Sequence, residues 1–460
     1  MLSAIGGGAL EVAGFELVYV TARGDGVRVG LADAWALRLE SVPPVRRFAS
    51  YRGLALIGGE ANAAGEALRG RGSHVSGTEL VPNAAADPLR IVLVAPPYFD
   101  IPPKGYGGTE VVVADLADAL VKRGHDVTVL GAGEPRTSAR LIPVWERTLA
   151  DRLGEPYPEI MHALKVRRVI ERIATTDGVD IVHDHTFAGP LNTPAYSAVG
   201  IPMVVTVHGP LDDDLYPYYR VLGDEVGLIA ISDRQRELAP ELNWVGRVHN
   251  ALRIDEWPFR ADKGDYALFL GRYAPYKGAH LALRAAHQAG IPLVLAGKCN
   301  EPPEQAYFNE QVRPLLTEND HVYGQVDAVS KARLLAGARC LLFPIQWEEP
   351  FGMVMIEAMA CGTPVVALRG GAVPEVIVDG VTGVVCDRPD ELPAAIERAQ
   401  TMDPVACRRH VAAHFGVAEF GSGYERIYRT VVGTAVSASR QAILRRVLRE
   451  RSNVAEPTTA

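Results

Sequence analysis

Three glutamates lie in or beside a strongly apolar stretch, WEEPFGMVMIEAMACGTPVVA, where carboxylates are unexpected. The residues from Met353 to Cys361 favour a helix, and the glycine and proline that follow them are stop signals. Glu348 and Glu349 therefore lie in the loop before this helix, and Glu357 lies inside it. A carboxylate is costly to bury without a partner. Glutamates here are suitable hydrogen-bond acceptors for hydroxyls, in which sugars and ribose are rich.

A second loop, GRYAPYKGAH, carries two cations, Arg272 and Lys277, after the apolar run YALFL. They are five residues apart, ahead of a predicted helix. Two cations beside free helix N–H groups suit a diphosphate, although a solvated basic loop has the same composition. Because carboxylates repel phosphate, the two loops together predict hydroxyl acceptors next to a diphosphate site.

A third loop, PPYFDIPPKGYGGTE, follows the apolar run RIVLVA. Gly107 and Gly108 stand immediately before a predicted helix, where free backbone N–H groups can approach an anion. A tight turn between strand and helix explains the same glycines. The loop is not a dinucleotide fingerprint, because Glu110 stands where the third glycine belongs, and this disfavours a nicotinamide oxidoreductase.

Histidines end two of the predicted strands. His208 follows PMVVTV, where it could donate to a substrate hydroxyl, take part in proton transfer, or simply be satisfied by a backbone carbonyl. His183 and His185, in VHDH, resemble a metal pair, but no further ligand is evident near them in the sequence. We therefore interpret this pair as polar strand-end residues, with a metal pair as the alternative.

The elements that position these loops repeat as strand, loop and helix. One series begins at Arg90 and a second at Tyr266. Continuous apolar runs such as RIVLVA are typical of parallel strands buried on both faces. Two such series predict an α/β fold with two facing doubly wound domains, and ligands bind such sheets beyond the carboxyl ends of the strands.

The chain before Arg90 does not follow this repeating pattern of strand, loop and helix. FELVYVTARGDGVRVGL reads as a hairpin turning at residues 24–26, and short apolar runs follow at Trp35 to Leu39 and Leu54 to Ile57. No chemistry is evident there. The predicted organisation is a β-rich extension with a linker (1–88), two Rossmann-like domains (89–255 and 256–432) and a basic helical tail (433–460).

The composition is that of an ordinary globular protein, with 48% hydrophobic and 22% charged residues among 460. A formal net charge of -8 gives no general attraction to nucleic acid. The N-terminus is a poor signal peptide, and no apolar run approaches the roughly 18 residues of a membrane span. Five cysteines without a C-x-x-C pair indicate free thiols. We expect a cytoplasmic protein.

The tail SRQAILRRVLRERS places four apolar residues among five arginines. This pattern predicts a solvated terminal helix. Weak peripheral contact with a membrane surface is the alternative.

The chain resembles the retaining GT-B glycosyltransferases of family 4 (glycosyltransferase group 1) from about Arg90 to Val432. Glu349 and Glu357 match the E-x7-E signature of that family. GRYAPYKG, VVTVHG and PPKGYGGTE resemble its diphosphate-binding, histidine and glycine-rich motifs, and AISDRQR and GGAVPEVIVDGVTGVV also fit. The motifs arrive in the order expected of the family. The first 80-odd residues lie outside the family pattern, and Ala251 stands where many relatives carry glycine.

The resemblance implies a role for each matching residue. Arg272 and Lys277 would hold the diphosphate of the donor and stabilise it as it leaves. Glu357 would accept from the ribose, and Glu349 from a hydroxyl of the sugar. His208 would contact that sugar from the opposite domain. The backbone groups would come from Gly352, Met353, Gly107 and Gly108.

The reaction implied is transfer of a hexose from a UDP- or GDP-sugar to a hydroxyl or other nucleophile, with retention at the anomeric carbon. The family favours front-face attack, in which the departing phosphate oxygen accepts the acceptor's proton. No cofactor and no metal are expected. The acceptor would be a sugar, a lipid-linked glycan or a small metabolite. Two alternatives stay open: another GT-B nucleotide-sugar enzyme, such as an epimerase or sugar-phosphate synthase, and a non-catalytic sugar-nucleotide-binding protein.

Overall fold

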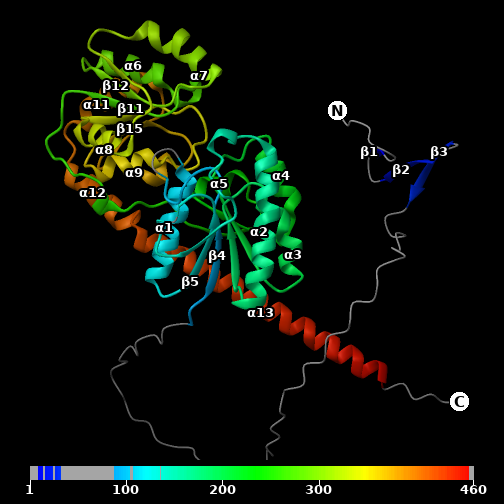
Figure 1. Ribbon diagram of the computed structural model, residues 1–460. Coiled ribbons are helices and arrows are strands. Elements are labelled where there is room, and N and C mark those ends of the chain that lie inside the picture. Colours follow the sequence, from blue (N-terminus) through cyan, green and yellow to red (C-terminus); the bar gives the residue numbers. More distant parts are fainter. Residues whose placement is uncertain are drawn as a thin grey trace, which may run out of the picture. The chain divides into compact units, whose positions relative to one another are not determined.

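The computed structural model of the chain describes residues 9–13, 16–23, 26–32, 87–103, 107–134 and 136–454, with side chains from residue 87 to residue 437. The chain divides into two compact units, Met1–Val81 and Pro82–Ala460. Figure 1 shows the elements of both units. Each unit is described by itself below.

The first unit contains a three-stranded antiparallel sheet made of β1 (Ala9–Ala13), β2 (Glu16–Arg23) and β3 (Gly26–Ala32). Arg23 pairs with Gly26 in the β2–β3 register, so the predicted hairpin is confirmed. The other two apolar runs predicted here, at 35–39 and 54–57, lie outside the described residues.

The second unit begins with a parallel sheet of seven strands in the order β10-β9-β8-β7-β4-β5-β6. Its strands are β4 (Arg90–Val94), β5 (Asp126–Gly131), β6 (Arg140–Pro143), β7 (Ile181–Asp184), β8 (Met203–Val207), β9 (Gly227–Ala230) and β10 (Trp244–Arg247). The helices associated with it are α1 (Gly108–Lys122), α2 (Pro156–Thr176), α3 (Thr193–Ser197), α4 (Leu215–Leu222) and α5 (Asp233–Leu238).

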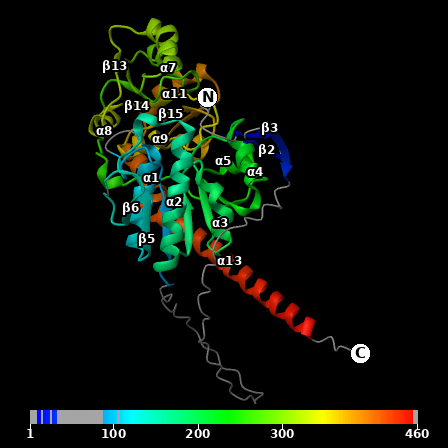
Figure 2. The same cartoon turned by 45° about the vertical axis from the view of Figure 1, so that its right-hand side comes forward.

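Alternate residues of each strand supply the two faces of this sheet. Ile91 and Leu93 of β4 pack in a core with α1, whereas Val92 and Val94 pack in a core with α2. Because both faces of β4 are covered by apolar side chains, the strand reads as a continuous hydrophobic run. Figure 2 shows the helices on either side of the sheet.

A second parallel sheet has six strands in the order β13-β12-β11-β14-β15-β16. Its strands are β11 (Ala267–Leu270), β12 (Leu293–Ala296), β13 (His321–Tyr323), β14 (Cys340–Phe343), β15 (Val365–Leu368) and β16 (Gly383–Cys386). The helices associated with it are α6 (Ala279–Gln288), α7 (Pro302–Tyr307), α8 (Ala328–Gly337), α9 (Met353–Ala360), α10 (Val373–Val376), α11 (Leu392–Ala399) and α12 (Pro404–His414). The predicted pair of doubly wound α/β domains is confirmed.

The last helix, α13 (Val417–Val454), is continuous over 38 residues. Tyr424 and Tyr428 are fully buried in the same core as α1, so α13 packs on the first sheet. Gly421 allows close contact, since a Cβ there would lie 2.8 Å from the Cβ of Ala119. Residues 417–432, which the sequence assigns to the second domain, thus pack on the first one, and the predicted tail helix (433–460) continues them.

The chain crosses between the two sheets at two neighbouring points. The first crossing follows β10, and the second leads from α12 into α13. Leu252 and Gly416 form an isolated parallel bridge, and the Leu252 N–H donates to the Phe415 carbonyl at 3.0 Å. The two connecting segments are therefore hydrogen-bonded to each other. No helix in the described part of the chain is both long enough and apolar enough to span a membrane.

Candidate active site

A cavity of about 320 Å³ lies between the two domains, lined by the loops that follow their strands. It brings together six of the nine residues that the sequence singles out, which are Gly108, His208, Lys277, Glu349, Gly352 and Met353. Gly107, Arg272 and Glu357 are not among the residues that line it.

The loop before α9 lines this cavity and leads directly into the helix. Gly352 precedes the helix with φ 81°, a left-handed conformation that favours glycine. A Cβ at this position would also lie 2.7 Å from the Met355 Cε. The glycine therefore lets the chain turn sharply into α9, where the Gly352 carbonyl accepts from the Met355 N–H at 3.0 Å. The first N–H groups of a helix are free to bind a ligand.

Lys277 and Glu349 form an ion pair inside the cavity. The Lys277 Nζ donates to Glu349 at 2.5 Å, and the Trp347 Nε1 donates to the same oxygen at 2.9 Å. The ammonium also lies 4.6 Å from the centre of the Trp347 ring. Since both charged side chains are mostly buried, at 17% and 12% exposed, the pairing limits the cost of their burial.

Arg272 and Glu357, two of the predicted residues that do not line the cavity, contact other side chains of the second domain. Arg272 follows β11 and donates to the Tyr276 hydroxyl at 2.9 Å. Glu357 is 8% exposed and accepts from the Lys331 Nζ at 2.8 Å. Lys331 comes from α8 and is the partner that a buried Glu357 requires. This partner could not be predicted from the sequence, because no local pattern pairs two residues 26 positions apart.

His208 lies on the opposite wall and contacts a second histidine. Its Nε2 is 2.8 Å from the Nδ1 of His185, at the end of β7. The His183 ring lies behind His185, with ring centres 4.0 Å apart, and is hydrogen-bonded to Thr206 and Tyr428. The sequence predicts that His183 and His185 are polar strand-end residues. In the structure both rings lie within contact distance of other side chains of the protein.

Burial sets the protonation state of this wall. Desolvation lowers the pKa of His208 to about 4, and it lowers the pKa of His185 as well. Both rings are therefore neutral near pH 7. On the same domain, burial raises the pKa of Glu110, in the first turn of α1, to about 7.

Asn250 is a lining residue that the sequence analysis did not single out. It is 4% exposed, and its Oδ1 has no hydrogen-bond partner among the described residues. A buried amide oxygen without a partner calls for an explanation, and a ligand hydroxyl in the cavity would satisfy it. The only available signal was its place in the stretch between the domains, HNALRIDEW.

Two family models match the chain, one on each domain. The model described as Glycosyltransferase Family 4 matches residues 106–251, and the model described as Glycosyl transferases group 1 matches residues 253–409. Both matched ranges contribute residues to the cavity.

Curated relatives and solved structures agree with these models. The chain is 29% identical to a phosphatidyl-myo-inositol mannosyltransferase of Mycolicibacterium smegmatis, over 76% of this chain and 95% of that protein. It is 27% identical to a glycogen synthase of Mycobacterium tuberculosis, over 71% and 89%.

Among solved structures, AviGT4, a glycosyltransferase involved in avilamycin A biosynthesis, is similar with a TM-score of 0.58 and 28% identity, over 75% of this chain and 98% of that one. A sucrose-phosphate synthase of Thermosynechococcus elongatus, 19% identical over 75% and 99%, shares the fold with a TM-score of 0.62. The two matched models, the two-domain GT-B fold and the relatives agree: the chain belongs to the group 1, family 4 glycosyltransferases and is an enzyme of that class.

Proposed function

We propose that this glycosyltransferase transfers a sugar from a UDP- or GDP-sugar to a hydroxyl acceptor with retention at the anomeric carbon, without a metal ion. The observation that carries the proposal is the cavity between the domains, where the Lys277–Glu349 pair faces His208. One wall carries charge that suits a diphosphate, and the other carries a neutral ring that suits a sugar hydroxyl.

The donor binds chiefly to the second domain. Lys277 and Arg272 meet the charge of the diphosphate, together with the backbone N–H groups at Gly352 and Met353. Glu357 accepts from the ribose while it keeps its hydrogen bond from the Lys331 Nζ. When the diphosphate binds, Lys277 exchanges its contact with Glu349 for the phosphate. Glu349 is then available to accept from a hydroxyl of the sugar.

The chemical step is front-face substitution. The bond between the anomeric carbon and the phosphate oxygen breaks, a bond to the acceptor oxygen forms on the same face, and the acceptor's proton passes to the departing phosphate oxygen. Cations and helix N–H groups stabilise the charge that develops on the diphosphate. His208, which is neutral, contributes a hydrogen bond rather than a charge. Closure of the domains excludes water.

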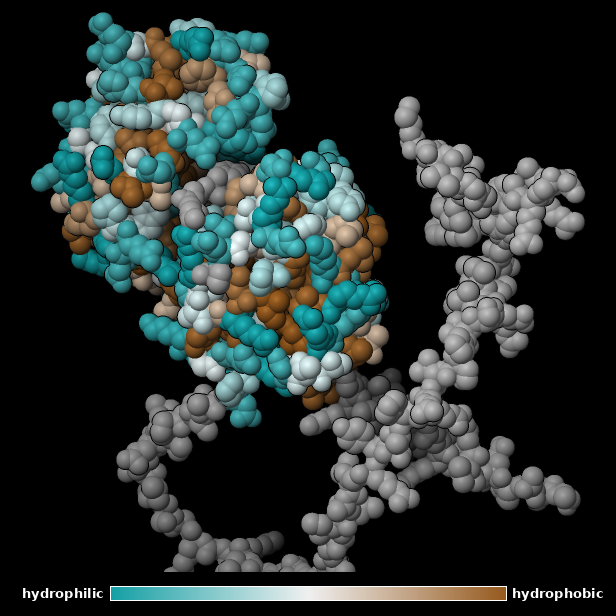
Figure 3. Space-filling model, viewed as in Figure 1, coloured by the Kyte–Doolittle hydropathy of each residue, from teal (hydrophilic) through white to brown (hydrophobic). Residues whose placement is uncertain are grey.

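The acceptor site belongs to the first domain, and its surface favours an apolar or lipid-linked acceptor. Tyr157, Ile160 and Leu164, spaced along α2, are each about half exposed, at 55%, 52% and 51%. Figure 3 shows hydrophobic surface on the visible face of this domain. The M. smegmatis relative is named for a lipid acceptor. We therefore propose a lipid-linked acceptor, with weak membrane contact by the basic tail (433–460).

We also propose a cytoplasmic location. The five cysteines all lie in the described part of the chain and are free thiols, four of them buried. Free thiols of this kind fit a reducing compartment.

Thermal unfolding with UDP, GDP, ADP and NAD tests the donor class. A ligand at 100 times its Kd adds about 2.7 kcal/mol to the free energy of unfolding, and this raises the Tm by roughly 5 to 10 °C. We expect a shift with UDP or GDP and with its sugar derivatives. A shift with NAD alone, or with none of the four, would contradict the proposal.

Product analysis then tests the chemistry. With the stabilising sugar nucleotide and lipid-linked or free sugar acceptors, NMR of the product should show the anomeric configuration of the donor. Activity should persist in EDTA. An inverted product or complete loss of activity in EDTA would refute the retaining or the metal-independent part of the proposal. Binding without transfer to any acceptor would favour the non-catalytic alternative.

A further inference from the structure

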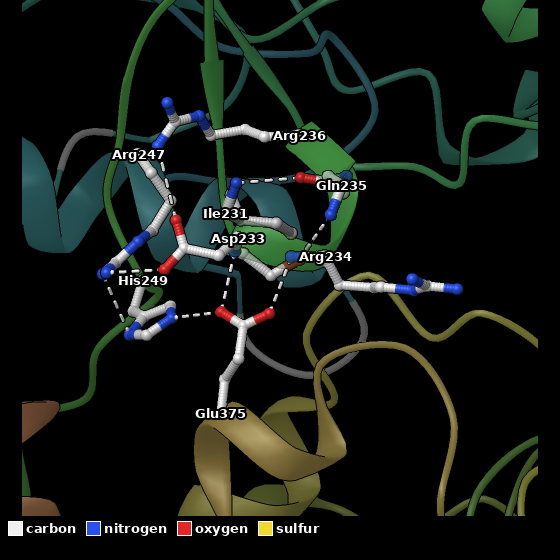
Figure 4. A network of polar contacts seen from close by, with 9 residues as sticks. Ile231, Asp233, Arg234, Gln235, Arg236, Arg247, His249 and Glu375 are labelled. Atoms are coloured by element: carbon white, nitrogen blue, oxygen red, sulfur yellow. Dashed lines mark hydrogen bonds and ion pairs between the residues drawn. The ribbon is translucent and has the colours of Figure 1, made fainter. Parts of the chain in front are cut away.

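Two motifs remain without a role in the reaction, AISDRQR in the first domain and GGAVPEV in the second, and the fold brings them into contact. Glu375 of α10 accepts hydrogen bonds from the backbone N–H groups of Asp233 and Arg234, both at 2.7 Å. The His249 Nε2 lies 2.9 Å from the same carboxylate. Figure 4 shows these groups converging on Glu375 from the first domain.

The contact satisfies donors that α5 cannot satisfy by itself. The first N–H groups of a helix have no partner within the helix, and the Ser232 side chain serves only that of Gln235. Glu375 serves the other two. Burial raises the pKa of Glu375, but the hydrogen bonds from His249 and the two backbone groups outweigh burial and leave the pKa below its ordinary value. The carboxylate is therefore ionised near pH 7.

A second bridge between the domains lies beside Glu349. Arg234 binds Glu348 through two parallel hydrogen bonds, from Nε at 2.9 Å and from Nη2 at 3.0 Å. Glu348 also accepts from the backbone N–H of Gly371 at 3.0 Å. The next residue, Ala372, donates its N–H to the Glu349 carbonyl at 2.9 Å. The bridge thus ends on the loop that carries Glu349.

On the first domain, the same short helix holds the segment around His208. The Gln235 Nε2 donates to the carbonyls of Val207, at 3.1 Å, and Gly209, at 2.9 Å. These carbonyls flank His208 on either side. Gln235 therefore fixes the backbone of His208 relative to α5, while Glu375 and Glu348 fix α5 relative to the second domain.

We propose that Glu375 and the Arg234–Glu348 pair are positioning residues that set the separation between His208 and Glu349 across the cavity. The inference rests on the proposed function, because it assigns these contacts to the geometry of sugar transfer. We call Arg234, Glu348 and Glu375 the clamp. The proposed nucleotide-binding side chains all belong to the second domain, and they are Arg272, Lys277 and Glu357. Because the clamp sets the position of the first domain, we expect it to govern sugar transfer more than nucleotide binding.

The first test compares Glu375→Ala with Glu397→Gln, an exposed glutamate on α11. In Glu375→Ala we expect the amides of Asp233 and Arg234 to exchange hydrogen at least about tenfold faster. We expect kcat/KM for transfer to fall about tenfold or more, through kcat, while the Kd for the stabilising nucleoside diphosphate stays within about twofold. Glu397→Gln should behave as the wild type. Unchanged exchange at both amides, or an equal loss of nucleotide binding, would overturn the inference.

The second test exchanges the charges of the bridge and does not depend on the fold tolerating the loss of Glu375. Arg234→Glu and Glu348→Arg should each lower kcat several-fold, and the double variant should recover to within about twofold of the wild type. Arg236→Glu, on the same helix, is the control. A double variant no better than either single one would refute the role of the bridge. If the wild type transfers no sugar, the proposed function fails, whereas the exchange measurement still decides whether the clamp exists.

Discussion

The two walls of the cavity differ in the charge that their side chains carry. The second-domain wall carries opposite charges that are paired with each other, Lys277 with Glu349, and the same domain holds a second such pair, Lys331 with Glu357. The first-domain wall carries histidines that burial keeps neutral. A charged wall can exchange one ionic partner for another when a phosphate arrives. A neutral, hydrogen-bonded wall can hold a hydroxyl in one orientation without attracting the phosphate.

The largest expected effect comes from removing the cation of the charged wall. Lys277→Ala should lower kcat by about 10²- to 10³-fold, as the loss of one preorganised electrostatic contact does in other active sites. It should also abolish the Tm shift with the nucleoside diphosphate. Lys122→Ala, an exposed lysine on α1, is the control. A variant that keeps its nucleotide affinity would place the diphosphate elsewhere.

A smaller effect is expected from the neutral wall. His185→Leu removes the hydrogen bond to His208 and should lower kcat/KM about tenfold, with nucleotide affinity unchanged. His185→Asn keeps a polar nitrogen near the position of Nδ1 and should recover much of the activity. Steady-state kinetics with matched Kd measurements test this pair. Equal activity of the Leu and Asn variants would mean that the contact does not orient His208.

Asn250 tests whether the neutral wall meets the sugar itself. Its unpaired Oδ1 predicts that Asn250→Ala costs little stability but weakens binding of the sugar nucleotide by about three- to tenfold. Binding of the nucleoside diphosphate alone should not change. Calorimetric titration with both ligands separates the two results. If both affinities fall together, Asn250 acts on the domain arrangement instead.

The last predicted effect is on stability rather than on activity, and it concerns Glu110. Its pKa is about 7 in the folded chain, above that of an ordinary carboxyl, because burial disfavours the charge. A raised carboxyl pKa means that the folded state binds more protons, so this group makes stability fall as pH rises from about 4.5 to about 7. Glu110→Gln should therefore be more stable than the wild type at pH 8, by about 1 to 3 kcal/mol, but not at pH 4. Urea unfolding at both pH values measures the difference. An equal stability difference at both would remove the pKa explanation.

Strand ends were predictable from the sequence, but side-chain partners were not. The rule that ligands bind beyond the carboxyl ends of parallel strands places His208, Lys277 and Glu349 near one another, and the structure brings all three to one cavity. Lys331, His185 and Glu375 acquire their roles only through contacts between segments far apart in the chain. No local pattern encodes such contacts.

The final helix shows the same limit at the level of whole elements. Periodicity predicts that a segment is helical but does not say which surface will cover its apolar face. Tyr424 and Tyr428 follow the second domain in sequence, yet their hydroxyls bond Thr206 and His183 of the first. A boundary placed by sequence order alone assigns them to the wrong sheet.

The paired crossing at Leu252 and Gly416 has a mechanical consequence. Two connecting segments that are hydrogen-bonded to each other restrict rotation of one domain about the other more than a single segment would. Cutting either connecting segment should leave the two domains covalently joined by the other segment but allow them to rotate more freely about each other. A nick near residue 252 should therefore increase the range of orientations that one domain can adopt relative to the other.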